Sequence, residues 1–393
     1  MKRSRFGARD RSSRDAAELQ RLAVGLSESD CRLEDIFWES RLVHLVQTLL
    51  QNGAEEEINT TLDRLYESNP QACDELANVV EAQVESCTLE TSGNKQRHDA
   101  LLFAVPILAW SRYAIPAARI NAAHLAALKV QLGAHMFSRE ARLALVDYFF
   151  GPDQLPRSYC DIRGLLEALC EQAAKEQDLS LDTQGLPETT RFLSDVRYLI
   201  GVVIVPQGAP VFRWHEADGS RAASLAAWEK QGSPNLAPLL TGCAYQPLSA
   251  GAYHAACRHA DRAARAYAIK ASVAFLQTTL GLMPEEIRAV IAPCYDQRLE
   301  EYRIGLAPRD HDNQVYHGVS WALLGEEDEH SDIPGQIDAV LRDCGVKDIV
   351  SLDHRMPMEF CDDCGAPLFP TVDGELVHAE IPEQADAMPT TLH

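Results

Sequence analysis

LLFAVPILAW, which runs from Leu101 to Trp110, is the most apolar stretch of the chain and decides its fold class. A helix that crosses a membrane needs about 18 uninterrupted apolar residues, so this stretch is too short for that role and has the length of a β-strand. A strand that is apolar along its whole length is buried on both faces of its sheet. Three other stretches have the same character, and we expect them to be buried strands too: Arg142–Phe150, Tyr198–Pro206 and Arg288–Pro293.

Helical patterns lie between these strands. Apolar residues recur at helical spacing over 121–137 and 161–174. The order strand, helix, strand, helix predicts a layered body with helices packed on a sheet. Shorter segments with strand or helix character follow: strands at Val211–Trp214, Tyr302–Leu306, Val315–Leu324 and Asp348–Leu352, and a helix at Ile333–Cys344. We expect an α+β fold whose body, residues 98–355, contains a mixed, partly antiparallel sheet.

The chain before this body is helical in pattern. Apolar residues from Leu19 to Leu49 follow helical spacing, and Asn69-Pro70 has the form of an N-cap followed by proline at the first helical position. These signals predict four helices in an N-terminal bundle, residues 15–90. The last of them would carry Cys73 and Cys87 on one face. The polar residues 91–95 then mark the expected domain boundary.

Composition and charge narrow the class of protein. The chain has 393 residues, 46% of them hydrophobic, and a formal net charge of −22. This balance is typical of a globular acidic protein and argues against a general nucleic-acid binder, because phosphate contacts need clustered Lys and Arg. No apolar segment follows the basic N-terminus, so we expect no secretory signal, no membrane partner and a cytoplasmic location.

Residues 1–14 are an electrostatic exception, since basic side chains outnumber acidic ones there. A short basic arm could dock on RNA, a ribosome or an acidic partner. The simpler interpretation, which we adopt, is a disordered and solubilising tail. Nucleic acid is therefore an expected partner only through this tail.

The 11 cysteines do not form a disulfide pattern. Their number is odd, their spacing is irregular and the chain is long, whereas disulfide scaffolds are small and dense in cysteine. We interpret nine of them as small buried hydrophobic residues. Cys361 and Cys364 are the exceptions.

The sequence lacks the common signatures of nucleotide binding, of serine hydrolases and of zinc proteases. It does contain a basic stripe on a long helix, about residues 251–279, beside an apolar seam that runs from Tyr253 through Ala264 to Ala274. Three side chains of this stripe form a candidate anion-binding site: His254, Arg258 and Arg262. The alternative is a solvated helix face on which Asp261 pairs with Arg265.

A polar loop over residues 310–317 offers a second group of candidate ligands. Asp310, His311, Asp312, Asn313 and His317 could be metal ligands. The same residue types form turns between strands, and we favour the turn because one short loop rarely completes a coordination shell.

The motif CDDCG, from Cys361 to Gly365, is the most specific signal in the chain. Two thiolates separated by two residues, with glycine after the second, form a knuckle typical of zinc sites. The prolines that follow disfavour the helix that a thioredoxin-type redox pair needs. A turn around Asp373-Gly374 would return His378 to the knuckle, and His354 or Cys344 could be the fourth ligand. The alternative is a loop with two unmetallated thiols in an irregular C-terminal segment, residues 356–393.

Two stretches carry a family resemblance. Residues 13–41 (SRDAAELQRLAVGLSESDCRLEDIFWESR) and 360–380 (FCDDCGAPLFPTVDGELVHAE) resemble an uncharacterised family of betaproteobacterial proteins of unknown function, and the resemblance runs over most of the chain. It implies a bacterial, cytoplasmic protein. It implies no activity, cofactor or catalytic residue.

Two classes of function follow from these observations. The first is a non-catalytic binding or adaptor protein, with a protein partner or self-association and a C-terminal zinc knuckle. The second is an enzyme that acts on a small anionic substrate near Arg258, Arg262 and the His311–His317 loop. We prefer the first class, because the sequence shows no nucleophile–base or acid–base pair at a diagnostic spacing.

Overall fold

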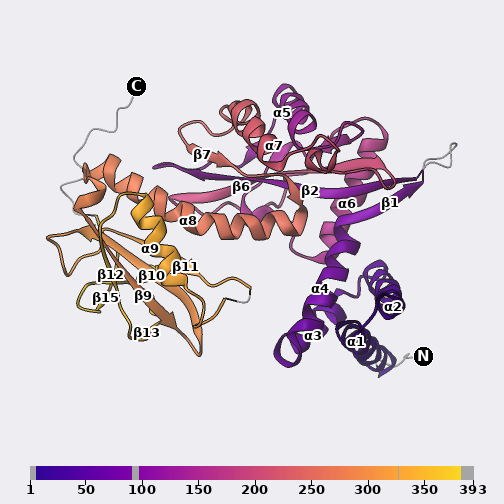
Figure 1. Cartoon of the computed structure of the whole chain (residues 1–393), viewed down its shortest axis with the longest axis horizontal. Coiled ribbons are helices and arrows are strands. Elements are labelled where there is room, and N and C mark those ends of the chain that lie inside the picture. Colours follow the sequence, from indigo (N-terminus) through magenta and orange to yellow (C-terminus); the bar gives the residue numbers. More distant parts are fainter. Residues whose placement is uncertain (1–5, 91–96, 326, 382–393) are drawn as a thin grey trace.

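The computed structural model describes residues 6–90, 97–325 and 327–381. Its α+β architecture consists of an N-terminal helical module, two larger β-sheets, two small two-stranded ones and an irregular C-terminal segment (Figure 1). The α+β class predicted from the sequence is therefore confirmed. None of the described helices combines the length and apolar composition needed to cross a membrane.

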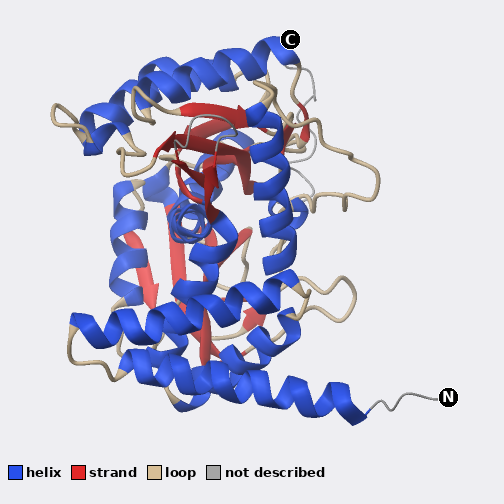
Figure 2. Cartoon of the chain, turned by 90° about the vertical axis from the view of Figure 1, so that its right-hand side faces the viewer, coloured by secondary structure: helices blue, strands red, loops and turns tan. Residues whose placement is uncertain are grey.

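The helical module contains four helices, as predicted: α1 (Phe6–Ser27), α2 (Arg32–Gln51), α3 (Glu55–Ser68) and α4 (Pro70–Glu85). Asn69 caps α4, since its side chain accepts a hydrogen bond from the backbone N–H of Ala72. The four helices pack against one another mainly through buried leucines and valines. In Figure 2, α1 is the helix along the bottom of the view.

Two expectations for this module differ from the structure. Residues 6–14 belong to α1 rather than to a disordered tail, because helix extends readily from the buried stripe that begins at Ala16; residues 1–5 lie outside the described residues. Cys87 does not share a helix face with Cys73, because α4 ends at Glu85 and the chain continues as strand β1 (Ser86–Glu90).

The first sheet is built around two long strands, β2 (Arg97–Trp110) and β6 (Ser194–Pro206). They pair antiparallel from His98–Pro206 to Trp110–Ser194. The strand order is β1-β2-β6-β4, in which β4 is Arg142–Leu145. Two short strands, β7 (Ala244–Pro247) and β8 (Gly251–Ala252), also pair with β2. Because β1 and β2 flank the undescribed residues 91–96 and pair with each other, the sheet continues across the expected domain boundary.

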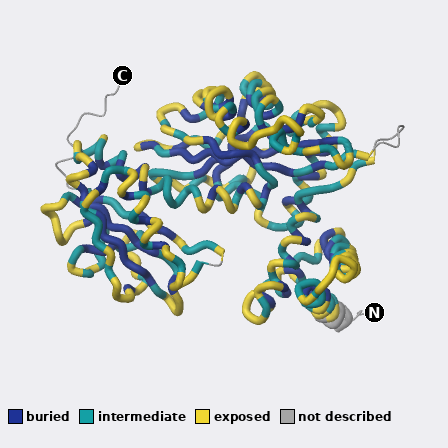
Figure 3. The backbone as a smooth tube through the Cα atoms, viewed as in Figure 1, coloured by how far each residue is buried: buried dark blue, intermediate teal, exposed yellow. Residues whose placement is uncertain are grey.

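Both faces of this sheet are covered, which explains the continuous apolar runs in its sequence. Leu102 and Ile204 face the helical module and α6 (Tyr159–Ala174), while Phe103 and Val203 face α5 (Ala122–His135) and α7 (Arg221–Ala227). In Figure 3 both central strands are buried over most of their length. Pro106 lies where the partner of β2 changes from β8 to β7, so its missing N–H breaks no ladder there.

The second sheet has the order β11-β10-β9-β12, with β9 (Ile287–Tyr295) and β10 (Leu299–Pro308) at its centre. Strand β11 (His317–Ala322) is antiparallel to β10, whereas β12 (Asp348–Ser351) and β13 (Met356–Pro357) are parallel to β9. Helix α9 (Ile333–Asp343) packs its apolar face on this sheet. The mixed, partly antiparallel sheet predicted from the sequence is thus divided between two larger sheets, the first antiparallel and the second mixed.

Residues 211–214 do not form the expected strand. Phe212 makes one isolated bridge with Phe137, and a short 3-10 helix follows at Arg213–His215. The aromatic rings of Phe137, Phe212 and Trp214 stack instead, with centroid separations of 5.7 and 4.7 Å. Apolar residues at this spacing therefore reflect an aromatic stack rather than a sheet edge.

Helix α8 (Tyr253–Leu280) joins the two sheets (Figure 1). Its first half buries Tyr253, Ala256 and Ala260 in the core of the first sheet, and its second half buries Ile269 and Leu276 in the core of the second. The expected seam is therefore correct only in part: Ala264 and Ala274 are half-buried, because the buried face changes where the helix passes from one sheet to the other.

The helical module meets α8 through carboxylates. A side-chain oxygen of Glu85, the last residue of α4, accepts a hydrogen bond of 3.0 Å from the backbone N–H of His254 in the first turn of α8. Arg258, one turn later, pairs with Glu81 at 2.5 Å. Burial raises the pKa of Glu85 to about 7. The hydrogen bond from His254 and the charge of Arg258 lower this pKa, but by less than burial raises it.

We therefore predict that Glu85→Gln flattens part of the pH dependence of stability. Between an ordinary pKa of 4.5 and about 7, the unfolded chain releases a proton that the folded chain retains, so the free energy of unfolding falls as pH rises. Glutamine still accepts the His254 N–H and does not titrate. The measurement is urea unfolding at pH 4.5 and at pH 8. The difference in free energy of unfolding between the variant and wild type should shift by about 2–3 kcal/mol in favour of the variant from the lower pH to the higher.

A matched control is Glu90→Gln, which removes an exposed carboxylate paired with Arg97 on the surface. Its pH profile should run parallel to that of wild type. Parallel profiles for Glu85→Gln and wild type would contradict the buried, proton-retaining Glu85.

Candidate metal centre

A buried arginine of the second sheet anchors the C-terminal segment. The side chain of Arg303, on β10, has no solvent exposure. Its guanidinium donates to a Glu301 carboxylate oxygen at 2.7 Å, to the carbonyl oxygen of Leu368 at 2.9 Å and to the carbonyl oxygen of Glu359. Its face lies over the ring of Phe360. One cation therefore holds both ends of the loop that contains Cys361 and Cys364.

The loop itself is closed by its own backbone. The N–H of Leu368 donates to the carbonyl of Glu359 at 3.1 Å, and the N–H of Cys361 donates to the carbonyl of Ala366 at 2.7 Å. Gly365 has a φ of 71°, in the left-handed region that favours glycine, and its N–H donates to the carbonyl of Cys361 at 2.8 Å. This is the local reason for glycine directly after the second cysteine.

A small hairpin returns the chain to this loop. Strands β14 (Phe369–Pro370) and β15 (Leu376–Val377) pair antiparallel, with Phe369 opposite Val377. Phe369 packs against Gly318 of β11, where a Cβ atom would collide with its ring. The hairpin therefore lies directly on the second sheet, and His378 follows Val377 back to the cysteines.

The three side chains converge. One ligand atom from each of Cys361, Cys364 and His378 lies within 4.8 Å of the other two, and Cys364 Sγ is 3.3 Å from His378 Nε2. Backbone N–H groups of Cys364 and Asp363, together with the Cys364 thiol, lower the pKa of the Cys361 thiol by hydrogen bonding to its sulfur. The loop therefore favours the thiolate form, which is the form that ligates metals.

The second nitrogen of His378 faces a carboxylate. Its Nδ1 lies 3.4 Å from an oxygen of Glu380, is buried and makes no hydrogen bond within the described residues. Metal-ligating histidines usually direct their second nitrogen at a carboxylate or carbonyl, which fixes the ring orientation. The geometry thus leaves Nε2 directed at the sulfurs.

Two thiolates and one imidazole form a donor set suited to zinc. Within the described part of the chain, no fourth Cys, His, Asp or Glu ligand atom joins the group. His354, expected as a possible fourth ligand, lies against Gly374 at the turn of the hairpin. Cys344, the other candidate, is the C-cap residue after α9 and is half-buried, which raises the pKa of its thiol.

The predicted anion site is divided among internal partners. Arg258 pairs with Glu81, and His254 lies 3.9 Å from the same carboxylate. Arg262 is exposed. Arg265 pairs with Glu327 at 2.5 and 2.9 Å rather than with Asp261. An external anion on His254, Arg258 and Arg262 stays a prediction, and it would compete with these carboxylates.

The second predicted ligand group, around His311, does not join this stripe. His311 and the OH of Tyr316 interact at 2.8 Å, and His317 lies against Phe275, with its pKa lowered to about 4 by burial. Arg258 and Phe275 lie on one helix and are 17 residues apart, or about 25 Å along its axis. The two halves of the alternative enzyme site are therefore not one site.

Sequence reasoning missed two residues of the centre. Arg303 lies in the apolar run of β10, where a lone cation among buried residues is itself a signal of an internal partner. Glu380 lies two residues after His378, and nothing in its local pattern distinguishes it from other exposed acids.

The fold and site thus define an α+β protein with a C-terminal cluster of two cysteines and one histidine. The chain belongs to the family described as Protein of unknown function (DUF2863), whose model matches residues 4–392. The expected membership of a family of unknown function is confirmed. No curated protein and no solved structure matches the chain.

We predict that Arg303→Leu strongly destabilises the C-terminal segment. The substitution leaves the Glu301 carboxylate and the carbonyls of Glu359 and Leu368 without their buried partner, a loss of about 3–5 kcal/mol in the free energy of unfolding. Hydrogen exchange at the backbone of residues 359–368 should accelerate together with this loss.

The matched control is Arg298→Leu, in which an exposed arginine paired with Glu300 is lost at about 1 kcal/mol or less. Equal effects of the two substitutions would mean that Arg303 does not anchor the segment.

Proposed function

We propose that this protein is a non-catalytic binding or adaptor protein of the cytoplasm whose C-terminal segment is organised by one zinc ion. The observation that carries the zinc proposal is the convergence of Cys361, Cys364 and His378 within 4.8 Å of one another. Zinc, when bound, would supply a tetrahedral centre of folding energy rather than a reaction.

The environment of the group supports zinc in a structural role. The three residues come from a preformed loop and a hairpin that Arg303 and β11 already hold in place. A metal would cross-link this loop to this hairpin, and a water or a partner side chain would complete the fourth position. All eleven cysteines are free, as a reducing compartment requires, which supports a cytoplasmic location.

We expect the purified full-length protein to contain about one zinc per chain, and Cys364→Ser and His378→Ala to lose most of it. His354→Ala is the matched control: it removes an imidazole that packs on the hairpin turn outside the ligand group, and its zinc content should equal that of wild type. Elemental analysis of protein purified without chelator gives the measurement. An absence of metal from wild type would refute the proposal.

The proposal of a protein partner rests on an exposed apolar surface of the helical module. On α2, Leu33, Ile36 and Phe37 are 80%, 49% and 46% exposed and lie at positions i, i+3 and i+4, which is one face of the helix. Exposed apolar side chains gathered on one helix face are typical of an interaction surface.

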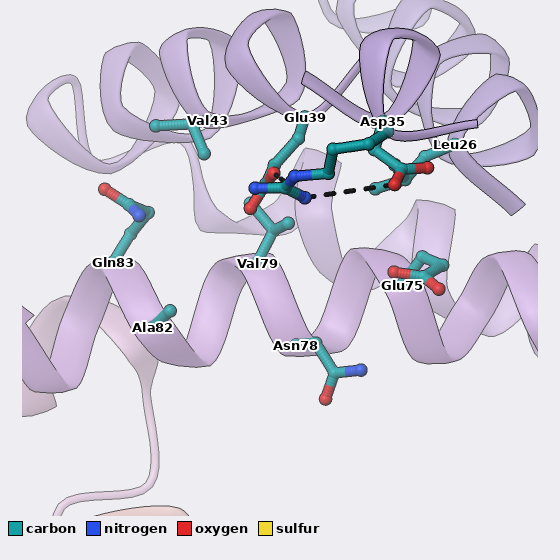
Figure 4. Close-up of a pocket in the computed structure, with 10 residues that line it drawn as sticks. Leu26, Asp35, Glu39, Val43, Glu75, Asn78, Val79, Ala82 and Gln83 are labelled. Atoms are coloured by element: carbon teal, nitrogen blue, oxygen red, sulfur yellow. Dashed lines mark ion pairs between the residues drawn. The ribbon is translucent and has the colours of Figure 1, made fainter. Parts of the chain in front are cut away.

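A groove of about 340 Å³ lies on another side of α2, between α2 and α4 (Figure 4). Its apolar side chains include Leu26, Val43 and Val79, and its acidic ones are Asp35, Glu39 and Glu75. The arginine of the groove, Arg32, is already paired with Asp35 and Glu39. The excess of carboxylates favours a partner segment that presents basic side chains beside apolar ones.

The test is affinity capture with the full-length protein, followed by a Kd for each captured protein after it is purified. Phe37→Asp and Glu39→Lys should each weaken binding about tenfold or more, because the first adds a charge to the apolar face and the second reverses the groove's charge. Val130→Asp, at an exposed valine on α5, should leave the Kd unchanged.

If Phe37→Asp and Glu39→Lys both bind as tightly as wild type, the adaptor surface is not on α2. If these two variants alter only self-association, measured by sedimentation, the occupant of the α2 surface is a second copy of this chain rather than a different partner.

A further inference from the structure

The candidate metal centre contains two thiols that can bond to each other. The ligand atoms of Cys361, Cys364 and His378 lie within 4.8 Å of one another, so the two sulfurs are at most that far apart. A disulfide bond is about 2.05 Å long, and the sulfurs need to approach by about 3 Å or less to form one. The cluster that is suited to zinc is therefore also suited to a disulfide.

Both cysteines of the cluster lie at the surface of the molecule. Cys364 is exposed and Cys361 is half-buried, whereas Cys170 and Cys294 are buried in hydrophobic cores. All eleven cysteines lie in the described part of the chain, and of these only Cys31 is exposed like Cys364. Cys31 is not a member of the cluster, so its reactivity measures what exposure alone does.

An imidazole lies beside the exposed thiol. Cys364 Sγ is 3.3 Å from Nε2 of His378. The other ring nitrogen, Nδ1, lies 3.4 Å from a carboxylate oxygen of Glu380, which favours a proton on Nδ1 and leaves Nε2 as an acceptor. A thiol, a base and a carboxylate that orients the base form the arrangement of an activated thiol. The Cys364 thiol therefore has a proton acceptor in place.

We propose that Cys361 and Cys364 are oxidised by small hydroperoxides to a reversible disulfide, and that this disulfide and bound zinc exclude each other. The zinc part of the inference rests on the proposed function, whereas the disulfide does not depend on it. A disulfide contains no thiolate, so the oxidised cluster retains only His378 as a ligand. Zinc, conversely, engages both sulfurs.

The reaction proceeds in two steps in the metal-free cluster. The Cys361 thiol releases its proton and its sulfur attacks one peroxide oxygen; the O–O bond breaks, and the departing oxygen takes up a proton and leaves as water when the oxidant is hydrogen peroxide. The Cys364 thiol then gives its proton to His378 Nε2, and its sulfur attacks the sulfenic acid of Cys361. The S–S bond forms, the S–O bond breaks, and the departing oxygen leaves as a second water with the proton from His378.

In total, two thiols are oxidised and one hydrogen peroxide is reduced to two waters. The lowered pKa of the Cys361 thiol supports its role as the attacking sulfur. Cys364, which has the imidazole as its proton acceptor, is then the resolving sulfur.

Oxidation changes which parts of the C-terminal segment are linked. Zinc would join the loop that contains both cysteines to His378, which follows β15 of the hairpin. The disulfide instead lies within the loop, so it does not connect the loop to the hairpin. Hydrogen exchange at the backbone of residues 376–380 should therefore be faster in the oxidised protein than in the zinc-loaded protein.

The probe is hydrogen peroxide, added in increasing amounts to metal-free full-length protein and to the same protein loaded with zinc. Free thiols are then blocked, and peptide mapping by mass spectrometry identifies the cysteines that escape blocking until dithiothreitol is added. In the metal-free protein, Cys361 and Cys364 should escape together at peroxide levels that leave Cys31 free. Zinc should slow this oxidation about tenfold or more, because it holds both sulfurs. The oxidised protein should bind zinc again only after dithiothreitol.

Variants separate the two steps. Cys364→Ser should leave a sulfenic acid on Cys361 that dimedone traps, and Cys361→Ser should abolish the disulfide. His378→Ala should slow closure of the disulfide in the metal-free protein, so that dimedone traps more sulfenic acid than in wild type. Cys31→Ser and His354→Ala are the matched controls, and both should oxidise as wild type does.

The proposal is overturned if Cys361 in the metal-free protein reacts no faster than Cys31, or if its disulfide partner is a cysteine other than Cys364. Equal zinc binding by the oxidised and the reduced protein would also overturn it. If the wild-type protein takes up no zinc at all, the proposed function fails, and the peptide map of the metal-free protein still decides on the disulfide. If a serine variant does not fold, the wild-type map decides by itself.

Discussion

Helix α8 is the constraint on which the rest of the structure depends, because it belongs to two cores at once. Its 28 residues extend over about 42 Å. The first half contributes Ala256 and Ala260 to the core of the first sheet, and the second half contributes Ile269 and Val273 to the core of the second. A continuous helix cannot tilt toward one sheet without moving against the other, so it fixes the position of both. Its first turn also receives Glu85 from the helical module.

Contacts with the second sheet fix the position of the C-terminal segment. That segment contains only short strands, and Pro357, Pro367 and Pro370 limit its regular hydrogen bonding. What fixes it is a buried cation beneath the loop and an aromatic ring packed on a glycine. Arg303 holds the carbonyls on both sides of the cysteines, and Gly318 admits Phe369. The metal ligands are therefore brought together by contacts with the sheet, to which a bound zinc would add.

Local sequence patterns predicted most of the elements, and long-range contacts account for most of what they missed. Strands β2 and β6 could be predicted because burial on both faces leaves a continuous apolar run. The segment at 211–214 was expected to be a strand from Val211, Phe212 and Trp214, but it stacks its rings on Phe137, a contact that no local pattern contains. The division into two sheets was equally hidden, because strand order depends on which strands meet.

The candidate centre shows the same limit. Cys361, Cys364 and His378 could be predicted because knuckle and hairpin signals are local and lie close together in sequence. The fourth ligand could not, since His354 packs against the hairpin turn instead. Arg303 acts on carbonyls 56 and 65 residues away. The expected helix face shared by Cys73 and Cys87 was wrong because α4 ends at Glu85, before Cys87.

The central claim is that the knuckle holds zinc through two sulfurs and one imidazole. X-ray absorption at the zinc edge tests it most directly on the purified full-length protein. The account predicts two sulfur neighbours at about 2.3 Å and one or two nitrogen or oxygen neighbours at about 2.0–2.1 Å, with the outer-shell scattering of a single imidazole. A zinc shell without sulfur, a shell of four sulfurs, or no zinc edge at all would contradict it.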